Sequence, residues 1–205
     1  MAHPLALEFA QRIAAERSGA RVLLLGAGSG RNVAPLRAAA LDVTIVEDDA
    51  RRARDAGERF AADPRVAVIH AAYAEPAAPG GAFSGVLSTH ALLHGCAADI
   101  VGAIRAIRER LVPGGLFFTT LGSVADPRYG AGRRIAARTF APRSGPEAGV
   151  PHTFFHDAGV RTLLGGFVIE SLAETSAAES AGRWAHSAHE AASIVHWFVR
   201  ASSPA

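Results

Sequence analysis

The feature that most constrains the fold is a short apolar run that ends in a cluster of glycines. Residues 22–25 are four consecutive aliphatic residues, and glycine then occupies positions 26, 28 and 30. Such a run is typical of a strand covered on both faces, as in a parallel sheet. The glycines allow a tight turn and the close approach of a ligand to the backbone. We therefore expect a strand, a glycine-rich turn and then a helix whose free N–H groups face a ligand.

Strands and helices alternate along most of the chain. Apolar runs predict further strands at residues 43–46, 66–69, 86–88, 116–121, 167–169 and 194–199. Apolar residues spaced three or four apart predict helices at about residues 5–17 and around the stripe Ile100, Ile104, Ile107 and Leu111. Further helices are expected at about residues 32–40, 49–61 and 157–164. This alternation indicates βαβ units with right-handed crossovers, and so an α/β fold on a mostly parallel sheet.

The character of the chain changes after Leu121. Residues 122–150 are rich in glycine, arginine and proline, so we expect an insertion or lid there rather than regular core. A length of 205 residues fits a single domain, residues 1–205, that carries this one insertion.

Charge and composition exclude several classes of protein. The chain has no lysine, and its 21 arginines are balanced by 19 acidic residues and dispersed, whereas a nucleic-acid partner requires a clustered basic face. No stretch approaches 18 apolar residues without a charge, so no membrane span is expected. The single cysteine, Cys96, excludes an intrachain disulfide. Because the N-terminus also lacks an apolar run of signal-peptide length, we expect a cytoplasmic protein without nucleic-acid or membrane partners.

The spacing of the glycines narrows the class of cofactor. A dinucleotide fingerprint requires Gly-x-Gly-x-x-Gly, and its third glycine would fall where this chain has Arg31. Glu47 follows Gly26 by 21 residues, at the end of the second expected strand. An acid there accepts two hydrogen bonds from ribose hydroxyls, although it would also serve as a helix N-cap. Asp48 and Asp49 are the better candidates for that cap.

Four segments together resemble the class I S-adenosylmethionine-dependent methyltransferases. They are Val22 to Gly30, Glu47, Gly85 to His94 and Arg110 to Leu116. The resemblance covers about residues 20–121, and the segments Gly149 to Phe155 and Gly165 to Phe167 resemble the branch of tellurite-resistance-type enzymes. It implies a Rossmann-like, doubly wound, seven-stranded sheet whose last strand, residues 194–199, is antiparallel and lies beside the fifth.

The resemblance also implies a site for S-adenosylmethionine. Residues 26–30 would pass under the methionine part and the ribose, and Glu47 would bind the ribose hydroxyls. Residues 72–73 would flank the adenine, and residues 88–90 would lie near the sulfonium and the substrate. The full set assigned to the cofactor is Gly26, Ala27, Gly28, Ser29, Gly30, Glu47, Asp48, Ala72, Tyr73, Ser88, Thr89 and His90.

Three positions depart from the family pattern, since Leu24, Ala72 and Ser84 stand where the family has acids. Each change removes a hydrogen bond worth on the order of 1 kcal/mol. Two alternatives therefore stay open. One is a non-catalytic relative that binds S-adenosylmethionine or S-adenosylhomocysteine, and the other is a nicotinamide-dependent oxidoreductase. Arg31 and the expected Pro-Gly-Gly turn at residues 113–115 count against the second.

The expected activity is methyl transfer to a small-molecule acceptor by a monomer or homodimer. Such a reaction depends mainly on alignment and on exclusion of water, and it needs a general base only if the nucleophile keeps its proton. His90 and His152 are the catalytic candidates. The substrate candidates are His94, Tyr129, Arg133 and His152. The histidine pairs 152/156 and 186/189 match no metal motif, so no metal is expected.

Overall fold

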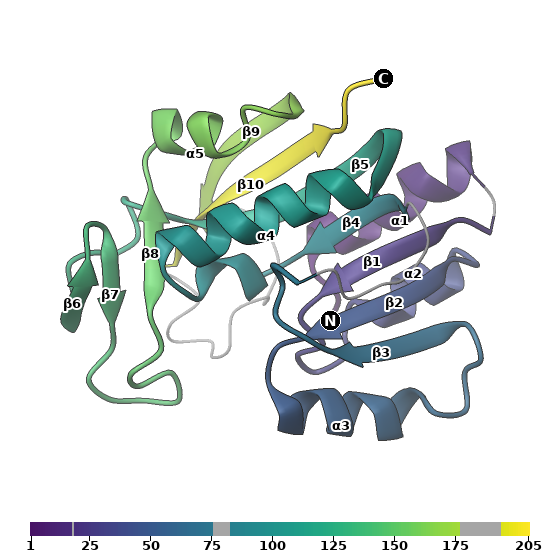
Figure 1. The fold of residues 1–205 in the computed structure, drawn as a ribbon, viewed down its shortest axis with the longest axis horizontal. Coiled ribbons are helices and arrows are strands. Elements are labelled where there is room, and N and C mark those ends of the chain that lie inside the picture. Colours follow the sequence, from purple (N-terminus) through teal and green to yellow (C-terminus); the bar gives the residue numbers. More distant parts are fainter. Residues whose placement is uncertain (18, 76–82, 177–193) are drawn as a thin grey trace.

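The computed structural model describes residues 1–17, 19–75, 83–176 and 194–205, and its centre is a twisted sheet (Figure 1). Histidines 186 and 189 lie outside these residues. The strands are β1 (Arg21–Leu25), β2 (Asp42–Glu47), β3 (Val66–His70), β4 (Phe83–Ser88), β5 (Leu111–Ser123), β6 (Arg133–Ala136), β7 (Thr139–Ala141), β8 (His152–Phe155), β9 (Val168–Ser176) and β10 (Val195–Ser202). The helices are α1 (Pro4–Glu16), α2 (Val33–Ala38), α3 (Ala50–Phe60), α4 (Ala97–Arg110) and α5 (Asp157–Leu163), with a 3-10 turn, η1 (Ala91–Leu93).

The order of the strands confirms the predicted fold class. Five strands run parallel in the order β3-β2-β1-β4-β5. β10 lies antiparallel beside β5, and β9 lies antiparallel beside β10. All seven strands expected from the sequence are present, and the last is antiparallel and next to the fifth. The chain leaves β1 toward β2 on one side and returns to β4 on the other, which creates a switch point at the carboxyl end of β1.

Helices cover both faces of the sheet, with α4 in front and α1 and α2 behind in the view of Figure 1. The side chains of β1 alternate accordingly. Val22 and Leu24 belong to the core cluster that holds the buried side of α1 and α2. Leu23 and Leu25 belong to the cluster that holds α4 and α5. The apolar run is therefore buried on both faces, as its composition predicted. None of the helices in the described part of the chain combines the length and hydropathy that a bilayer crossing requires.

Local signals at the helix ends were mostly read correctly. Asp49 is the N-cap of α3, and its Oδ1 accepts a hydrogen bond from the N–H of Arg52 at 2.8 Å. Leu111 begins β5 instead of extending the helical stripe. The expected turn at residues 113–115 lies within β5, at a shift in the register of its pairing with β4. On either side of this shift, Leu111 pairs with Phe83 and Leu116 pairs with Gly85. The prediction of a separate turn there was wrong because this segment bulges while the strand continues.

The insertion is more regular than the sequence suggested. β6 and β7 form an antiparallel hairpin, and β7 pairs with β8. β8 in turn runs parallel to the last two residues of β5, Gly122 and Ser123. β10 pairs with Gly122 along one edge of β5. β8 therefore pairs along the opposite edge, beyond the point where the pairing of β4 with β5 ends. The hairpin therefore projects from the carboxyl end of the sheet (Figure 1), beside the switch point.

Gly85 fixes how closely α1 approaches the sheet. A Cβ at this position of β4 would lie 2.5 Å from Cζ of Phe9 and 2.9 Å from Cδ1 of Ile13, both on α1. We expect Gly85→Ala to lower the free energy of unfolding by about 1–3 kcal/mol through overpacking, measured by urea denaturation. Gly57→Ala is the matched control, because a Cβ there meets nothing within 4 Å in α3 and should stabilise the helix by about 0.5–1 kcal/mol. Equal stabilities of the two variants would contradict this packing argument.

Candidate functional site

The main candidate site is a cavity of about 310 Å³ at the carboxyl ends of β1, β2 and β4. Its volume is at the lower end of the range of small-molecule sites, about 300–1,000 Å³. It lies at the switch point of the sheet, where α/β folds bind their ligands. Ten of the residues proposed from sequence line it: Gly26, Ala27, Gly28, Ser29, Glu47, Asp48, Tyr73, Thr89, His90 and His94. We call it the switch-point cavity.

The glycine-rich turn supplies one wall of this cavity. Gly26 and Gly28 have φ angles of +82° and +47°, which only glycine adopts without strain. The N–H of Gly26 donates to the carbonyl of Val46 at 2.8 Å, which ties the turn to β2. A Cβ on Gly28 would meet nothing within 4 Å, so the turn faces open space. A ligand can therefore approach the backbone at this position.

Glu47 joins two walls of the cavity through its carboxylate. The side chain is 1% exposed. Its Oε2 accepts a hydrogen bond from the N–H of Ala27 at 2.8 Å, and its Oε1 accepts one from the N–H of Asp49 at 3.2 Å. Burial raises the pKa of Glu47, against the lowering effect of these two N–H groups. Since Asp49 caps α3, the alternative of Glu47 as the helix cap was wrong.

Asp48 and Tyr73 form the opposite side of the cavity. The hydroxyl of Tyr73 donates to Oδ1 of Asp48 at 3.2 Å. Burial, reinforced by the charge of Glu47, raises the pKa of Tyr73, so its hydroxyl keeps its proton. Both residues also line an adjoining cavity of about 230 Å³, which includes Ala72 and Leu92. A flat apolar group in this second cavity would lie against the ring of Tyr73.

The loop after β4 contributes two histidines. His90 has a left-handed backbone with φ +67° and donates its N–H to Oγ1 of Thr120 at 2.8 Å. His90 and His94 flank the 3-10 turn η1, and both line the switch-point cavity. The ring of His90 packs edge-on against those of His3 and His196, at 5.4 Å and 5.3 Å between centroids.

A second cavity of about 250 Å³ lies within the insertion. Its walls are mainly apolar and include Phe140, Phe154 and Ile194. Arg128, Glu147 and His152 supply its polar groups. We call it the insertion cavity. Because Glu147 lines this cavity and the switch-point cavity as well, the two spaces meet at this side chain.

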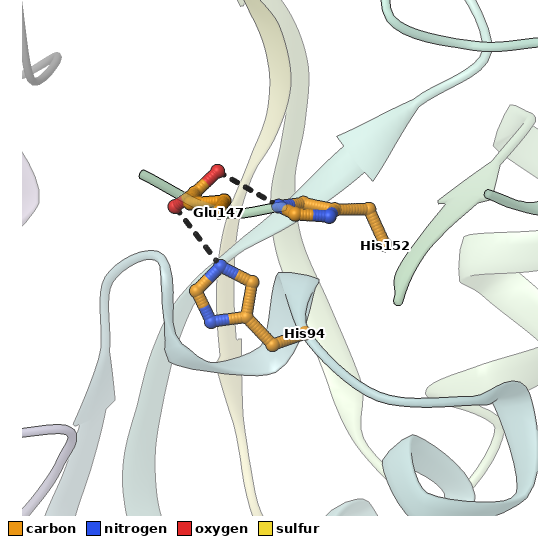
Figure 2. A group of neighbouring side chains, drawn as sticks. All are labelled: His94, Glu147 and His152. Atoms are coloured by element: carbon orange, nitrogen blue, oxygen red, sulfur yellow. Dashed lines mark hydrogen bonds and ion pairs between the residues drawn. The ribbon is translucent and has the colours of Figure 1, made fainter. Parts of the chain in front are cut away.

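Glu147 lies between two histidines at that junction (Figure 2). One of its carboxylate oxygens, Oε2, is 3.0 Å from Nε2 of His152, and the other, Oε1, is 3.4 Å from Nε2 of His94. His152 is 4% exposed, and its Nδ1 is 2.9 Å from the carbonyl of Val150. The two imidazoles hold the pKa of Glu147 far below its usual range, so the carboxylate is ionised.

Comparison with known proteins agrees with this geometry. Residues 22–115, which run from β1 into β5 and carry the glycine turn, Glu47 and the loop after β4, match the family model described as "Methyltransferase domain". Residues 22–115 are similar to that family. No curated protein matches the sequence of the chain.

Solved structures share the fold of this chain. A methyltransferase of Methanosarcina mazei, described as S-adenosylmethionine-dependent, has a TM-score of 0.72 at 15% identity, over 92% of this chain and 94% of that one. The 1,6-didemethyltoxoflavin-N1-methyltransferase of Burkholderia thailandensis, with bound 1,6-didemethyltoxoflavin and S-adenosylhomocysteine, has 0.67 at 19%, over 98% and 79%. TehB of Haemophilus influenzae has 0.66 at 14%, over 97% and 62%. At these identities the likeness shows the fold.

Several proposed residues lie outside the switch-point cavity. Ser88 is fully buried in β4, between Leu25 of β1 and Thr119 of β5. A Cβ on Gly30 would lie 2.8 Å from the ring of Phe60, so this glycine faces α3. Ala72 lines the adjoining cavity instead. The structure therefore brings residues 26–29 of the turn and the two residues after β4 to the cavity, but not Gly30, Ala72 or Ser88.

Of the four candidate substrate residues, one lines each cavity and two line neither. His152 lines the insertion cavity, and His94 lines the switch-point cavity. Tyr129 is 40% exposed and packs edge-on against Phe140 and Phe154, so it supports the wall without lining the cavity. Arg133 is exposed on β6 and lines neither cavity.

Sequence reasoning missed three residues of the site. Arg31 lines the switch-point cavity, and its Nη2 is 3.3 Å from Nδ1 of His90. Burial lowers the pKa of Arg31. Asn32 donates to Oγ1 of Thr89 at 2.7 Å and accepts a bond from the N–H of His3 at 3.0 Å. The position of both directly after the glycine turn was the available signal. For Glu147, the third, only its spacing of five from His152 was visible.

Proposed function

We propose that the protein is an S-adenosylmethionine-dependent methyltransferase that acts on a small-molecule acceptor. The observation that carries the proposal is the overlap of two findings. The residues that match the methyltransferase family model also line the cavity at the switch point of the sheet. The Burkholderia relative, whose fold is shared, holds S-adenosylhomocysteine together with a small heterocyclic substrate.

The residues of the switch-point cavity suit the chemical groups of this cofactor. The buried carboxylate of Glu47 keeps lone pairs for ribose hydroxyls after accepting two backbone N–H groups. The guanidinium of Arg31 offers a charged fork for the carboxylate of the methionine part. Tyr73 and the adjoining cavity provide an apolar surface for the adenine. When bound, S-adenosylmethionine supplies an electrophilic methyl group on a sulfonium.

The insertion cavity is the proposed acceptor site. Phe140, Phe154 and Ile194 give it an apolar wall that excludes water, and it opens toward the cofactor site beside Glu147. In such a reaction most of the rate enhancement comes from holding the acceptor in line with the methyl group. His90 borders the switch-point cavity and is the proposed proton-handling group, and His152 borders the insertion cavity and is a proposed positioning group. We further propose that the insertion closes over the bound acceptor as a lid.

Thermal unfolding with ligands tests the proposal directly. In separate samples, S-adenosylmethionine, S-adenosylhomocysteine and NADH are each added in excess. A ligand at 100 times its dissociation constant stabilises the fold by about 2.7 kcal/mol, so we expect a clear rise in the unfolding temperature with both adenosyl compounds.

The three outcomes separate the alternatives. The absence of a shift with either adenosyl compound would refute the proposal, and a shift with NADH alone would favour an oxidoreductase. Stabilisation by the adenosyl compounds without methyl transfer to any member of a panel of small hydroxyl, thiol and amine acceptors would favour a binding protein that has lost catalysis.

A further inference from the structure

We propose that His94, Glu147 and His152 form a binding site for a divalent first-row transition metal ion. The ion would lie at the junction of the switch-point and insertion cavities, in contact with the acceptor. Binding of the ion stands on the geometry of the cluster, while its role in methyl transfer rests on the proposed function.

The distances within the cluster are close to those of a metal site. Metal–nitrogen and metal–oxygen bonds of about 2.0–2.2 Å put neighbouring ligand atoms of a tetrahedral site roughly 3.4 Å apart. The nitrogens of His94 and His152 lie 3.4 Å and 3.0 Å from the oxygens of Glu147. One ligand atom from each residue can be chosen so that all three lie within 4.8 Å of one another. A small rotation of the partly buried His94 ring would close the triangle.

Backbone pairing holds the two histidines side by side. His94 and His152 face each other across an antiparallel bridge. The N–H of Gly95 donates to the carbonyl of Pro151 at 2.9 Å, and Oγ1 of Thr153 donates to the carbonyl of Gly95 at 2.8 Å. Gly95, directly after His94, is thus fastened to the residues on either side of His152. Such preorganisation lowers the cost of assembling three ligands around one ion.

The second nitrogen of His152 supports the same conclusion. Its Nδ1 donates to the carbonyl of Val150 at 2.9 Å, and its Nε2 is directed at Oε2 of Glu147 at 3.0 Å, where a metal ion would take the place of the Nε2 proton. Metal-binding histidines characteristically donate their other N–H to a carbonyl or a carboxylate in this way. The ring is 4% exposed, so this orientation is also fixed by packing.

The donor set indicates the class of ion. Imidazole nitrogens favour zinc, iron, cobalt or nickel, whereas magnesium and calcium prefer oxygen ligands. Three protein ligands leave at least one position open, as in catalytic zinc sites. Glu147 and His152 line the insertion cavity, so that position is accessible to an acceptor bound there.

An ion at this junction would activate the acceptor. A hydroxyl or thiol that binds a metal ion loses its proton more readily. The proton passes to water, and the acceptor atom then forms a bond to the methyl carbon. The bond from that carbon to sulfur breaks, and its electron pair stays on sulfur as a neutral thioether. The reaction consumes no oxidant or reductant.

Cobalt binding to the tag-free, chelator-treated chain tests the site without any need for activity. We expect one Co²⁺ per chain with visible d–d absorption, displaced by Zn²⁺. Loss of an outer-shell partner alone reduces metal affinity 10–100-fold, so Glu147→Gln and His152→Ala should each weaken binding by more than about 100-fold. His70→Ala is the matched control, because His70 is an exposed histidine on β3 outside the cluster; its affinity should equal that of the unaltered chain.

Absence of Co²⁺ absorption, or equal binding by the cluster variants and the unaltered chain, would overturn the proposal. The near-isosteric Glu147→Gln variant, verified as folded by circular dichroism, guards against a trivial loss through unfolding. Titration of the metal-free chain with S-adenosylhomocysteine separates the two proposals. If this ligand binds and Co²⁺ does not, the metal site is refuted and the proposed function stands; the converse refutes only the proposed function.

Discussion

Glu47→Ala should weaken the binding of S-adenosylhomocysteine by about 100-fold, measured by titration calorimetry. The physical reason is the loss of two hydrogen bonds to a carboxylate, which contribute about 1.5–3 kcal/mol each. Their sum, at least about 3 kcal/mol, corresponds to at least about two powers of ten in the dissociation constant. The side chain is 1% exposed and anchored by the N–H groups of Ala27 and Asp49, so it is held in position before a ligand arrives.

Two controls isolate the carboxylate. Glu47→Gln keeps one acceptor oxygen and should lose less affinity than Glu47→Ala. Asp49→Asn removes a negative charge two residues away, retains a good N-cap for α3, and alters no residue that lines the switch-point cavity; its affinity should be unchanged. A dissociation constant for folded Glu47→Ala within about tenfold of the original, or about 1.4 kcal/mol, would refute the ribose role.

The sheet could be predicted from sequence because its information is local. The run from Val22 to Leu25 is apolar on both faces, and it is buried on both faces. Its strand must then end at the glycines, which puts the turn at the carboxyl edge. Glu47 follows by the same logic, since it closes the next strand along the sheet. These positions depend on periodicity and on chain direction, which a single sequence carries.

The missed residues depend on contacts between distant segments. Glu147 meets His94 across 53 positions of the sequence, because β8 takes the upper edge of β5 and brings its loop to η1. The insertion was expected to be irregular from its glycines and prolines, and its short strands have too few residues for a clear alternation. Ser88 was assigned by its position after an apolar run. It is the last residue of β4, and its neighbours in β1 and β5 bury it completely.

The same long-range packing buries two histidines, and the stability of the fold should fall steeply below pH 6.5. His3 is 0% exposed and His196 is 2% exposed. Burial lowers the pKa of each from 6.5 to about 3, aided by the charge of Arg31 for His3 and of Arg128 for His196. Both rings pack against His90, so they form part of the wall behind the switch-point cavity.

The sign follows from proton binding. Between pH 6.5 and 3 the unfolded chain binds two more protons at these histidines than the folded chain does. Their stabilising effect is therefore complete above pH 6.5 and is lost as the pH falls toward 3. The slope approaches about 1.4 kcal/mol per pH unit for each histidine, which amounts to about 3 kcal/mol for both between pH 6.5 and 5. The lowered pKa of Asp126 acts in the same direction at lower pH, and the raised pKa of Glu47 opposes it.

Comparison of variants removes the contribution of those carboxylates. Urea denaturation of His196→Gln at several pH values should give a slope smaller by about 1.4 kcal/mol per pH unit. Glutamine offers an amide oxygen to Nη2 of Arg128, which now lies 3.0 Å from Nε2 of His196. His70→Gln changes an exposed histidine and should leave the slope unaltered. If His196→Gln unfolds with the same pH dependence as the original chain, then His196 must accept a proton while buried, and desolvation does not control its titration.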